Sequence, residues 1–356
     1  MNKPFRARIA VLVSGGVDSA VSLALLKEQG YDVTAFYLKI WLEDELSYLG
    51  ECPWQEDLSY VERLCTQFDV PLKIVSLQKE YWDLVVSYTL SEIKAGRTPN
   101  PDIMCNKQIK FGAFLQHIDD TFDYIASGHY AQTSIIEGKP VLWCAPDPIK
   151  DQTYFLSYLS VQQLARLMFP IGHLTKQQVR AEAQRLNLPN KDRKDSQGIC
   201  FLGMIKFRDF IKHHMGTQSG DFIEYETGLL LGKHDGYWFY TIGQRQGLGL
   251  SGGPWYVVSK DIAQNKIVLS RHYYDHDKQR DTFFVQEIQW FSGKMPIDKK
   301  LAVKLRHGAH KINCILEHVS DQIYKVILAE RDQGIAAGQF AVFYSDQLCL
   351  GGGTIL

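Results

Sequence analysis

The sequence predicts an α/β protein. It should have an N-terminal parallel sheet with helices on both faces, a small mixed central domain and a C-terminal antiparallel β-barrel. Three observations support this order. Residues 9–77 alternate β-rich and helix-periodic runs, which is typical of parallel βαβ units. After Met204, glycines separate short β-rich runs. Beyond Thr282, several runs alternate apolar and polar residues, as a half-buried antiparallel sheet requires.

Length and composition limit the class of protein. A chain of 356 residues exceeds the usual size of a single core, so we expect domains over residues 1–204, 205–280 and 281–356. The 45% hydrophobic and 22% charged residues are typical of a globular protein. With a formal net charge of -1, contacts with nucleic acid must come from local basic patches. Residues 1–8 are too short for a signal peptide and no apolar run reaches ~18 residues, so we expect a cytoplasmic protein with no membrane contact.

The cysteines indicate chemistry more than architecture. None of the seven forms a Cys-x-x-Cys pair, and their odd number in a cytosolic chain argues against a disulfide framework. Their spacing also argues against a structural zinc site, so no metal ligands are predicted. Any disulfide should therefore be transient. The cysteines are Cys52, Cys65, Cys105, Cys144, Cys200, Cys314 and Cys349.

The first strand is expected to end in a glycine turn that opens a helix. The apolar run from Ile9 breaks at Ser14-Gly15-Gly16, and an apolar-periodic segment follows up to Gly30. Free amides at a helix start attract phosphate, and glycines let the backbone approach it closely. The turn lacks the lysine of a Gly-x-x-x-x-Gly-Lys-Ser/Thr loop, so amides and the Ser14 and Ser19 hydroxyls would hold the phosphates. Asp18 is placed for a metal or for capping; the alternative is an ordinary turn capped by Asp18 or Ser19.

The next elements complete the alternation. We predict strands over residues 33–38 and 72–77, and helices over 54–68 and 80–95, each from its hydrophobic period. A parallel sheet built this way holds ligands at the carboxyl ends of its strands. The glycine turn lies at such an end.

Residues 96–102 cannot continue the preceding helix. Pro99 and Pro101 fix a stiff, extended loop, after which Cys105 stands near the start of another helix. Helix amides and the neighbouring Lys107 and Lys110 would favour its thiolate, which makes Cys105 a candidate reactive residue. The alternative is that Cys105 fills space in a helix interior.

Four further elements are predicted before the sequence becomes rich in glycines and short β-rich runs after Met204. We expect a strand over residues 124–127 that ends at Gly128-His129, and a hairpin over 130–144 that turns at 137–140. A helix opens at Lys150-Asp151-Gln152, and a capping box at Thr175 starts a helix to Leu186 that needs no function.

Residues 191–201 are predicted to form a polar, glycine-containing surface loop that ends near Cys200. A loop cysteine is less easily explained as core filling than a helical one. The alternative is that residues 199–201 form a short buried anchor.

The second half is read as one helix followed by strands. The helix covers residues 206–214, and the β-rich runs lie at 236–242, 255–259, 283–290, 301–307, 311–319, 323–329 and 340–344.

Several motifs in this order resemble one family. Ser-Gly-Gly-Val-Asp-Ser at residues 14–19 resembles the pyrophosphate loop of the ATP pyrophosphatase superfamily, whose members adenylate an oxygen of the substrate. Together with four further blocks it resembles the tRNA-specific 2-thiouridylases (the MnmA/TrmU family). These blocks are Gly-Arg-Thr-Pro-Asn-Pro-Asp-x-x-Cys-Asn at 96–106, Asp-Ser-x-Gly-Ile-Cys-Phe at 195–201, Thr-Ile-Gly-Gln-Arg-Gln-Gly-Leu-Gly at 241–249 and Cys-Leu-Gly-Gly-Gly at 349–353.

The resemblance implies an adenine nucleotide alpha hydrolase-like first domain and conversion of the wobble uridine (U34) of tRNA to 2-thiouridine. ATP would adenylate the C2 oxygen of the uracil. A persulfide on Cys200 would then supply the sulfur, with Cys105 assisting by forming a disulfide with Cys200. Asp102 would transfer a proton, and the stiff loop before Cys105 would line the pocket of the splayed-out base.

The resemblance also implies binding residues and partners. ATP, with Mg²⁺ on its phosphates, would be held by Leu12, Val13, Ser14, Gly15, Gly16, Val17, Asp18, Ser19, Leu38 and Gly128. The tRNA would contact Asn100, Pro101, Asp102, His129, Lys150, Asp151, Gln152, Arg306, His307 and Gln339. A sulfur-donor protein, such as a cysteine desulfurase or a relay carrier, would load Cys200.

Two other readings remain open from the sequence. The chain could be another adenylating pyrophosphatase, such as an amide-forming ligase or a different tRNA thiolase, although these would not require both Cys105 and Cys200. It could also be a non-catalytic RNA-binding or sulfur-carrier protein on a degenerate nucleotide fold. The intact loop at residues 14–19 argues against that second reading.

Overall fold

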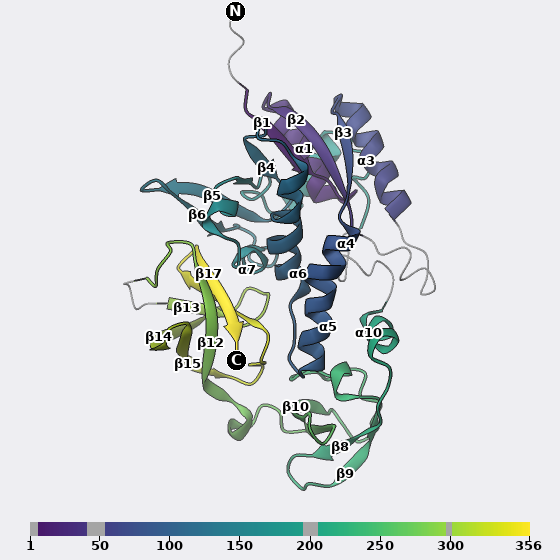
Figure 1. Cartoon of the computed structure of the whole chain (residues 1–356), viewed down its shortest axis with the longest axis vertical. Helices are drawn as coiled ribbons and strands as arrows, with labels where there is room; N and C mark the ends of the chain where they lie inside the picture. The colour runs from purple at the N-terminus through teal and green to yellow at the C-terminus, as the bar shows by residue number, and fades with distance from the viewer. Residues whose placement is uncertain (1–5, 41–53, 195–205, 297–300) are drawn as a thin grey trace, which may run out of the picture.

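The N-terminal part of the chain is built on a five-stranded parallel sheet, as predicted (Figure 1). The structure is a computed structural model that describes residues 6–40, 54–194, 206–296 and 301–356. The strand order is β3-β2-β1-β4-β7, and every neighbouring pair is parallel. The strands are β1 (Arg8–Leu12), β2 (Asp32–Lys39), β3 (Leu72–Ser76), β4 (Tyr124–Ala126) and β7 (Leu167–Met168).

Helices cover both faces of this sheet because side chains of β1 alternate between two buried clusters. Ile9 and Val11 pack with α1 (Val17–Glu28), α3 (Trp54–Phe68) and α9 (Lys176–Arg185). Ala10 and Leu12 face the opposite side, where the remaining helices of this domain pack. Those helices are α4 (Gln78–Tyr81), α5 (Ser87–Lys94), α6 (Pro101–Met104), α7 (Thr153–Leu156), α8 (Val161–Leu164), the π-helix Cys105–Lys110 and the 3₁₀ helix Ala113–His117.

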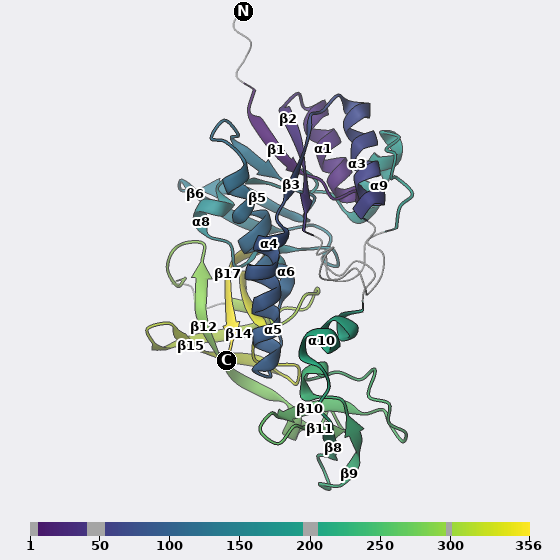
Figure 2. The same ribbon diagram turned by 45° about the vertical axis from the view of Figure 1, so that its right-hand side comes forward.

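The helix predicted over residues 80–95 is present as one rod that contains a π-helical turn. α4 and α5 are joined by the π-helix Trp82–Val86, and α5 extends away from the sheet toward the central domain (Figure 2). The periodicity predicted the extent of the rod but not the wider turn within it.

The prediction of an extended loop over residues 96–102 is wrong at its end. Pro101 and Asp102 lie in the single turn of α6, and the Asn100 side chain caps that turn by accepting a hydrogen bond from the Ile103 amide (3.2 Å). Proline is well tolerated at the first position of a helix, where its missing N–H costs nothing. Helix α6 therefore begins at Pro101, inside the segment that the two prolines had indicated to be extended.

The central domain contains a four-stranded sheet of order β10-β11-β8-β9 in which β8 and β11 are parallel. Its elements are α10 (Phe207–Met215), β8 (Gly220–Glu224), β9 (Leu230–His234), β10 (Tyr256–Asp261) and β11 (Lys266–Ser270). The strand predicted over residues 236–242 is wrong, since the 3₁₀ helix Tyr237–Phe239 lies there after Gly236 at φ +143°. The Tyr237 hydroxyl donates to the Lys94 carbonyl (2.6 Å), which ties this domain to the end of α5.

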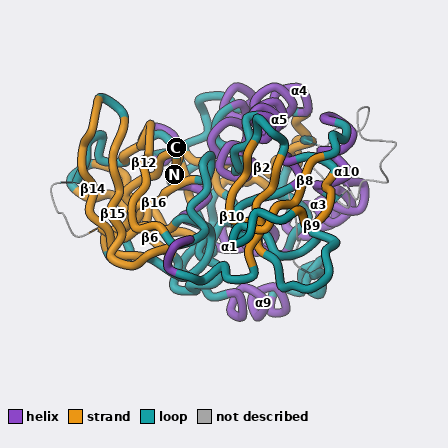
Figure 3. The backbone as a smooth tube through the Cα atoms, turned by 90° about the horizontal axis from the view of Figure 1, so that it is seen from below, coloured by secondary structure: helices purple, strands orange, loops and turns teal. Residues whose placement is uncertain are grey.

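The C-terminal part is a closed six-stranded antiparallel barrel of order β12-β15-β14-β13-β16-β17, in which β17 pairs back onto β12. Its strands lie together on one side of the molecule (Figure 3). The predicted hairpin, β5 (Ala131–Ile136) and β6 (Lys139–Cys144), extends the barrel sheet at β17. The barrel elements are β12 (Arg280–Trp290), β13 (Leu301–Lys304), β14 (Ile312–Ser320), β15 (Ile323–Asp332), β16 (Phe340–Ser345) and β17 (Leu348–Ile355), and the 3₁₀ helix His276–Lys278 precedes them.

Strand β17 was not predicted, because glycines in a strand interior are usually unfavourable. Its three consecutive glycines allow close approach of other segments. A Cβ on Gly351 would lie 1.9 Å from the Gln289 carbonyl oxygen of β12, and one on Gly352 would lie 2.8 Å from the Ser157 Oγ. The glycines thus let β17 close the barrel and pack on the N-terminal domain. Within the four described ranges, no helix has the length and apolar character needed to cross a bilayer.

Candidate functional site

The glycine loop between β1 and α1 leaves the first helical amides without a side-chain cap. Gly15 adopts φ +78°, and Gly16 is the N-cap of α1 without a side-chain cap. Neither Asp18 nor Ser19 caps the helix, so the reading as an ordinary capped turn is wrong. Instead, the Ser19 hydroxyl donates to the Gly16 carbonyl (3.0 Å) and accepts from the Ser14 amide (3.2 Å), which fixes the shape of the loop.

A lysine from a distant helix supplies the cation that the loop itself lacks. The Lys176 ammonium lies 2.8 Å and 3.0 Å from the two carboxylate oxygens of Asp18, and the Tyr130 hydroxyl donates to Asp18 Oδ1 (2.8 Å). Lys176 is the first residue of α9, directly after the Thr175 N-cap. Sequence reasoning missed it because the capping box already explained that segment.

The other residues expected at a nucleotide site lie at the same edge of the sheet. Leu38 is near the carboxyl end of β2, and Gly128 follows β4. A Cβ on Gly128 would lie 2.7 Å from the Ser19 amide nitrogen, so only glycine permits this contact between the β4 loop and α1. The strand order changes direction between β1 and β4, which is where sheets of this class hold ligands.

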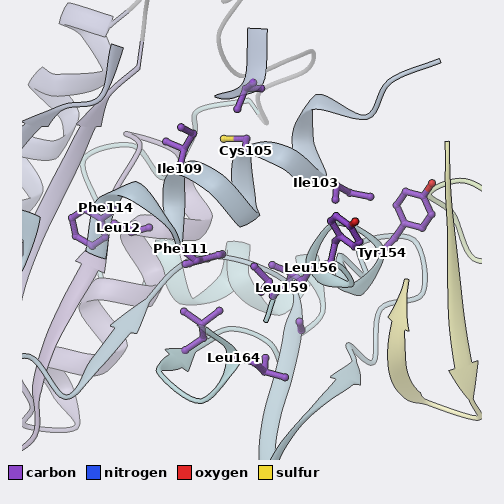
Figure 4. Packing of buried hydrophobic residues seen from close by; sticks show 14 of the residues in the cluster. Leu12, Ile103, Cys105, Ile109, Phe111, Phe114, Tyr154, Leu156, Leu159 and Leu164 are labelled. Atoms are coloured by element: carbon purple, nitrogen blue, oxygen red, sulfur yellow. The ribbon is translucent and has the colours of Figure 1, made fainter. Parts of the chain in front are cut away.

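Cys105 is buried on the face of the sheet opposite α1. Its side chain is 1% exposed and belongs to the same cluster as Leu12 and Ile109 (Figure 4). The Lys107 ammonium lies over the Tyr158 ring, 3.6 Å from its centroid. Lys107 is therefore directed at an aromatic ring of the α7–α8 segment, and burial lowers the pKa of its ammonium.

One cluster of titratable side chains interacts through electrostatic forces. Its members are Asp102, Lys110, His129 and His307. Burial raises the pKa of the Asp102 carboxyl, while its interactions with Lys110 and His307 oppose that rise. Burial and Lys110 hold the pKa of His129 well below its ordinary value, so its ring is neutral near pH 7. His129 Nδ1 lies 2.8 Å from the Ser127 hydroxyl. A carboxyl with a raised pKa holds its proton to higher pH than an ordinary aspartate does.

Asp151 is held inside the protein. Its carboxylate forms an ion pair with Lys304 (2.8 Å), both side chains are 2% exposed, and the Thr153 hydroxyl and the Ala145 amide also donate to it. The expected contact between this carboxylate and tRNA is thus not supported by its position. Gln152 is also engaged, since its side-chain oxygen accepts from the Tyr130 amide (2.9 Å).

The barrel residues expected at the tRNA lie on loops beside this cluster. The exposed Arg306 is paired with Asp332, with 2.5 Å between Arg306 Nη2 and Asp332 Oδ2. The His307 ring stacks on Phe155, with centroids 4.8 Å apart. Gln339 follows Gly338, which packs so closely on Thr98 that a Cβ would lie 3.0 Å from its amide nitrogen.

Comparisons with known proteins agree with this arrangement. The family model described as "tRNA methyl transferase HUP domain" matches residues 7–204, more than half of the chain. The "tRNA methyl transferase PRC-barrel domain" matches residues 208–271 and the "Aminomethyltransferase beta-barrel domain" residues 280–355. The tRNA-specific 2-thiouridylase MnmA of Parabacteroides distasonis is 49% identical over 98% of both chains, and that of Porphyromonas gingivalis is 47% identical over the same shares. This chain belongs to the tRNA-specific 2-thiouridylase family.

A 4-thiouridine synthetase solved with RNA and bound ATP is similar at 13% identity, with a TM-score of 0.36, over 58% of this chain and 50% of that one. A score this low supports no conclusion about this 2-thiouridylase family member.

Cys200 and its motif at residues 195–201 lie outside the described residues. Of the residues expected from the 2-thiouridylase resemblance, the structure gathers those of the nucleotide loop at one sheet edge. It gathers Asp102, His129 and His307 in the neighbouring cluster. The Asp151 side chain is only 2% exposed.

The Asp151–Lys304 pair joins the N-terminal domain to barrel strand β13, and we expect it to matter for stability. Lys304→Met leaves a buried carboxylate without its cation, so it should lower the free energy of unfolding by about 3–5 kcal/mol. The double variant Asp151→Asn/Lys304→Met should recover much of that loss, as measured by urea denaturation. Equal stability of the single variant and the wild type would contradict the structural role.

Proposed function

We propose that the protein converts the wobble uridine (U34) of tRNA to 2-thiouridine by ATP-dependent sulfur transfer. The observation that carries the proposal is that the candidate nucleotide loop and the candidate reactive cysteine border the same buried cluster. The glycine loop follows Leu12, the last residue of β1, and Leu12 belongs to the same buried cluster as Cys105. In a member of the 2-thiouridylase family, this combination supports activation of an oxygen at the loop and delivery of sulfur from a cysteine in the cluster that borders it.

In the first step, the C2 oxygen of the uracil attacks the α-phosphate of ATP and pyrophosphate leaves. The loop amides and the Ser14 hydroxyl would hold the phosphates, and Lys176 would offset the negative charge that develops on them. Mg²⁺ would neutralise phosphate charge when bound. Because the Asp18 carboxylate is already engaged by Lys176, the ion would be carried mainly by the phosphates.

In the second step, the terminal sulfur of a persulfide on Cys200 attacks C2, and the oxygen departs with AMP. The thiolate of Cys105 then attacks Cys200 Sγ, which forms a disulfide and releases the thiocarbonyl product. A cellular thiol must reduce the disulfide before the next cycle. Asp102, with its raised pKa, would move the proton at the base or at Cys105.

The tRNA would lie across the face formed by Asn100, Pro101, Asp102, His129, Lys150, Gln152, Arg306, His307 and Gln339. A uracil stacked in an anticodon loop must be splayed out to reach C2, and the Phe155–His307 stack offers an aromatic surface beside it. In this scheme residues 1–204 perform the chemistry, 281–356 add tRNA contacts and 205–280 connect them. A sulfur-donor protein in the cytoplasm would load Cys200.

The direct test is the product. Purified protein, unmodified tRNA, ATP and a persulfide donor should yield 2-thiouridine at position 34, detected by mass spectrometry of nucleosides. Sulfur-for-oxygen exchange differs in mass from methylation, so the same measurement tests the methyl transfer named in the family description. A methylated nucleoside, or no ATP-dependent product, would contradict the proposal.

A further inference from the structure

The carbonyl oxygen of Gly15, at the centre of the glycine loop, is held by two side chains from one distant turn. Asn190 Nδ2 donates to it at 2.8 Å and Arg193 Nη1 at 3.1 Å. Both residues follow α9, and Asn190 is only 3% exposed. The sequence pattern gave no reason to connect this turn with the loop.

The two donors are themselves fixed in place. The Arg193 guanidinium forms an ion pair with Asp57 of α3 and lies over the Tyr60 ring, 5.0 Å from its centroid. The Arg180 guanidinium donates to the Arg193 carbonyl at 2.6 Å. The contact is tight, because a Cβ on Gly15 would lie 3.0 Å from Arg193 Nη1. The turn after α9 therefore holds the Gly15 carbonyl group. Contacts with α3 and α9 fix Arg193 of that turn in place.

Holding this carbonyl sets the direction of the next amide. In a trans peptide the C=O and the following N–H point to opposite sides, so a Gly15 oxygen held by Asn190 and Arg193 directs the Gly16 N–H away from them. Glycine at φ +78° has little intrinsic preference that would keep this peptide from rotating. The amides of Gly16 and Val17 have no acceptor in the described part of the chain.

We propose that Asn190 and Arg193 are positioning residues of the nucleotide site. They lock the Gly15–Gly16 peptide so that the Gly16 amide faces the phosphates of ATP. Neither side chain needs to touch the nucleotide. This inference rests on the proposed function, because it assumes that the loop binds ATP.

The test is the affinity of the full chain for ATP, measured by titration calorimetry. Asn190→Asp keeps the shape of the side chain but replaces the donor with an acceptor facing the Gly15 oxygen. We expect Kd for ATP to rise about tenfold, the effect of losing one hydrogen bond, while tRNA affinity stays unchanged. The matched control is Asn187→Asp, whose side-chain oxygen accepts from Lys191 and remains an acceptor after the change.

A second pair of variants protects the test against a folding failure of Asn190→Asp. Arg193 uses different nitrogens for Gly15 and Asp57, and a lysine has only one. Arg193→Lys should therefore weaken ATP binding, but less than Arg193→Met, which removes both contacts. A graded loss of this kind supports positioning by the guanidinium.

Three outcomes overturn the inference. If Asn190→Asp and both Arg193 variants bind ATP with wild-type affinity, these side chains are not needed to orient the Gly15–Gly16 peptide. A lower melting temperature with unchanged Kd shows that the two residues only hold the turn together. If the wild-type chain itself binds no ATP, the proposed function fails as well, and that result is distinct from a failure confined to the variants.

Discussion

Asp18→Asn is expected to reduce ATP-dependent formation of pyrophosphate by about 100-fold or more, with little effect on tRNA binding. The reason is the contact between Asp18 and Lys176. The asparagine keeps the size of the side chain and can still accept from Tyr130, but it removes the charge that holds the Lys176 ammonium beside the loop. Pyrophosphate release in the presence of unmodified tRNA measures the effect directly.

The matched control is Asp221→Asn in the central sheet, where Asp221 pairs with Lys233 in a similar carboxylate–ammonium contact far along the chain. That variant should release pyrophosphate at the wild-type rate. Lys176→Met should be as damaging as Asp18→Asn. The double variant should be no worse than either single one, since both changes break the same pair. Fully additive losses, or a wild-type rate in Asp18→Asn, would contradict this account.

The strands and helices that the sequence predicted well are those whose side chains follow one buried face. Helix α3 ends at Phe68 as predicted and is helical from Trp54, the first residue described there, because its apolar residues repeat at helical spacing. The segments predicted wrongly are those whose conformation is decided by contacts with other parts of the chain. Strand β17 forms through Gly351–Gly353, which have poor strand propensity but allow close packing against β12.

The same distinction applies to the candidate site. The glycine loop could be predicted, because strand, glycine turn and helix are local in sequence. Lys176 and Asn190 could not be predicted, since each contacts the loop from more than 150 residues away along the chain. Asp151 shows the reverse case. The resemblance implied a contact with tRNA, but the structure buries its carboxylate against Lys304. Whether a charged side chain in a motif faces a ligand or the interior is decided by tertiary packing.

The two cysteines are expected to separate activation from sulfur transfer. Cys200→Ser should abolish 2-thiouridine formation while ATP affinity stays at the wild-type value, because the glycine loop proposed to bind ATP contains no cysteine. Pyrophosphate release should also persist. Thiolated nucleosides are measured by mass spectrometry and ATP affinity by calorimetry. Full thiolation by Cys200→Ser with a physiological sulfur donor would exclude a persulfide on this residue.

Cys105→Ala should fail at a later point. Without the resolving thiol, sulfur attached to C2 remains linked to Cys200, so the variant should retain tRNA in a covalent complex that an added thiol releases as 2-thiouridine-containing product. The control is Cys65→Ala in α3, because Cys65 is also buried in an apolar cluster, at 5% exposure, on the opposite face of the sheet. It should thiolate tRNA normally and form no such complex. A Cys105→Ala variant that turns over at the wild-type rate would show that this thiol only fills the core.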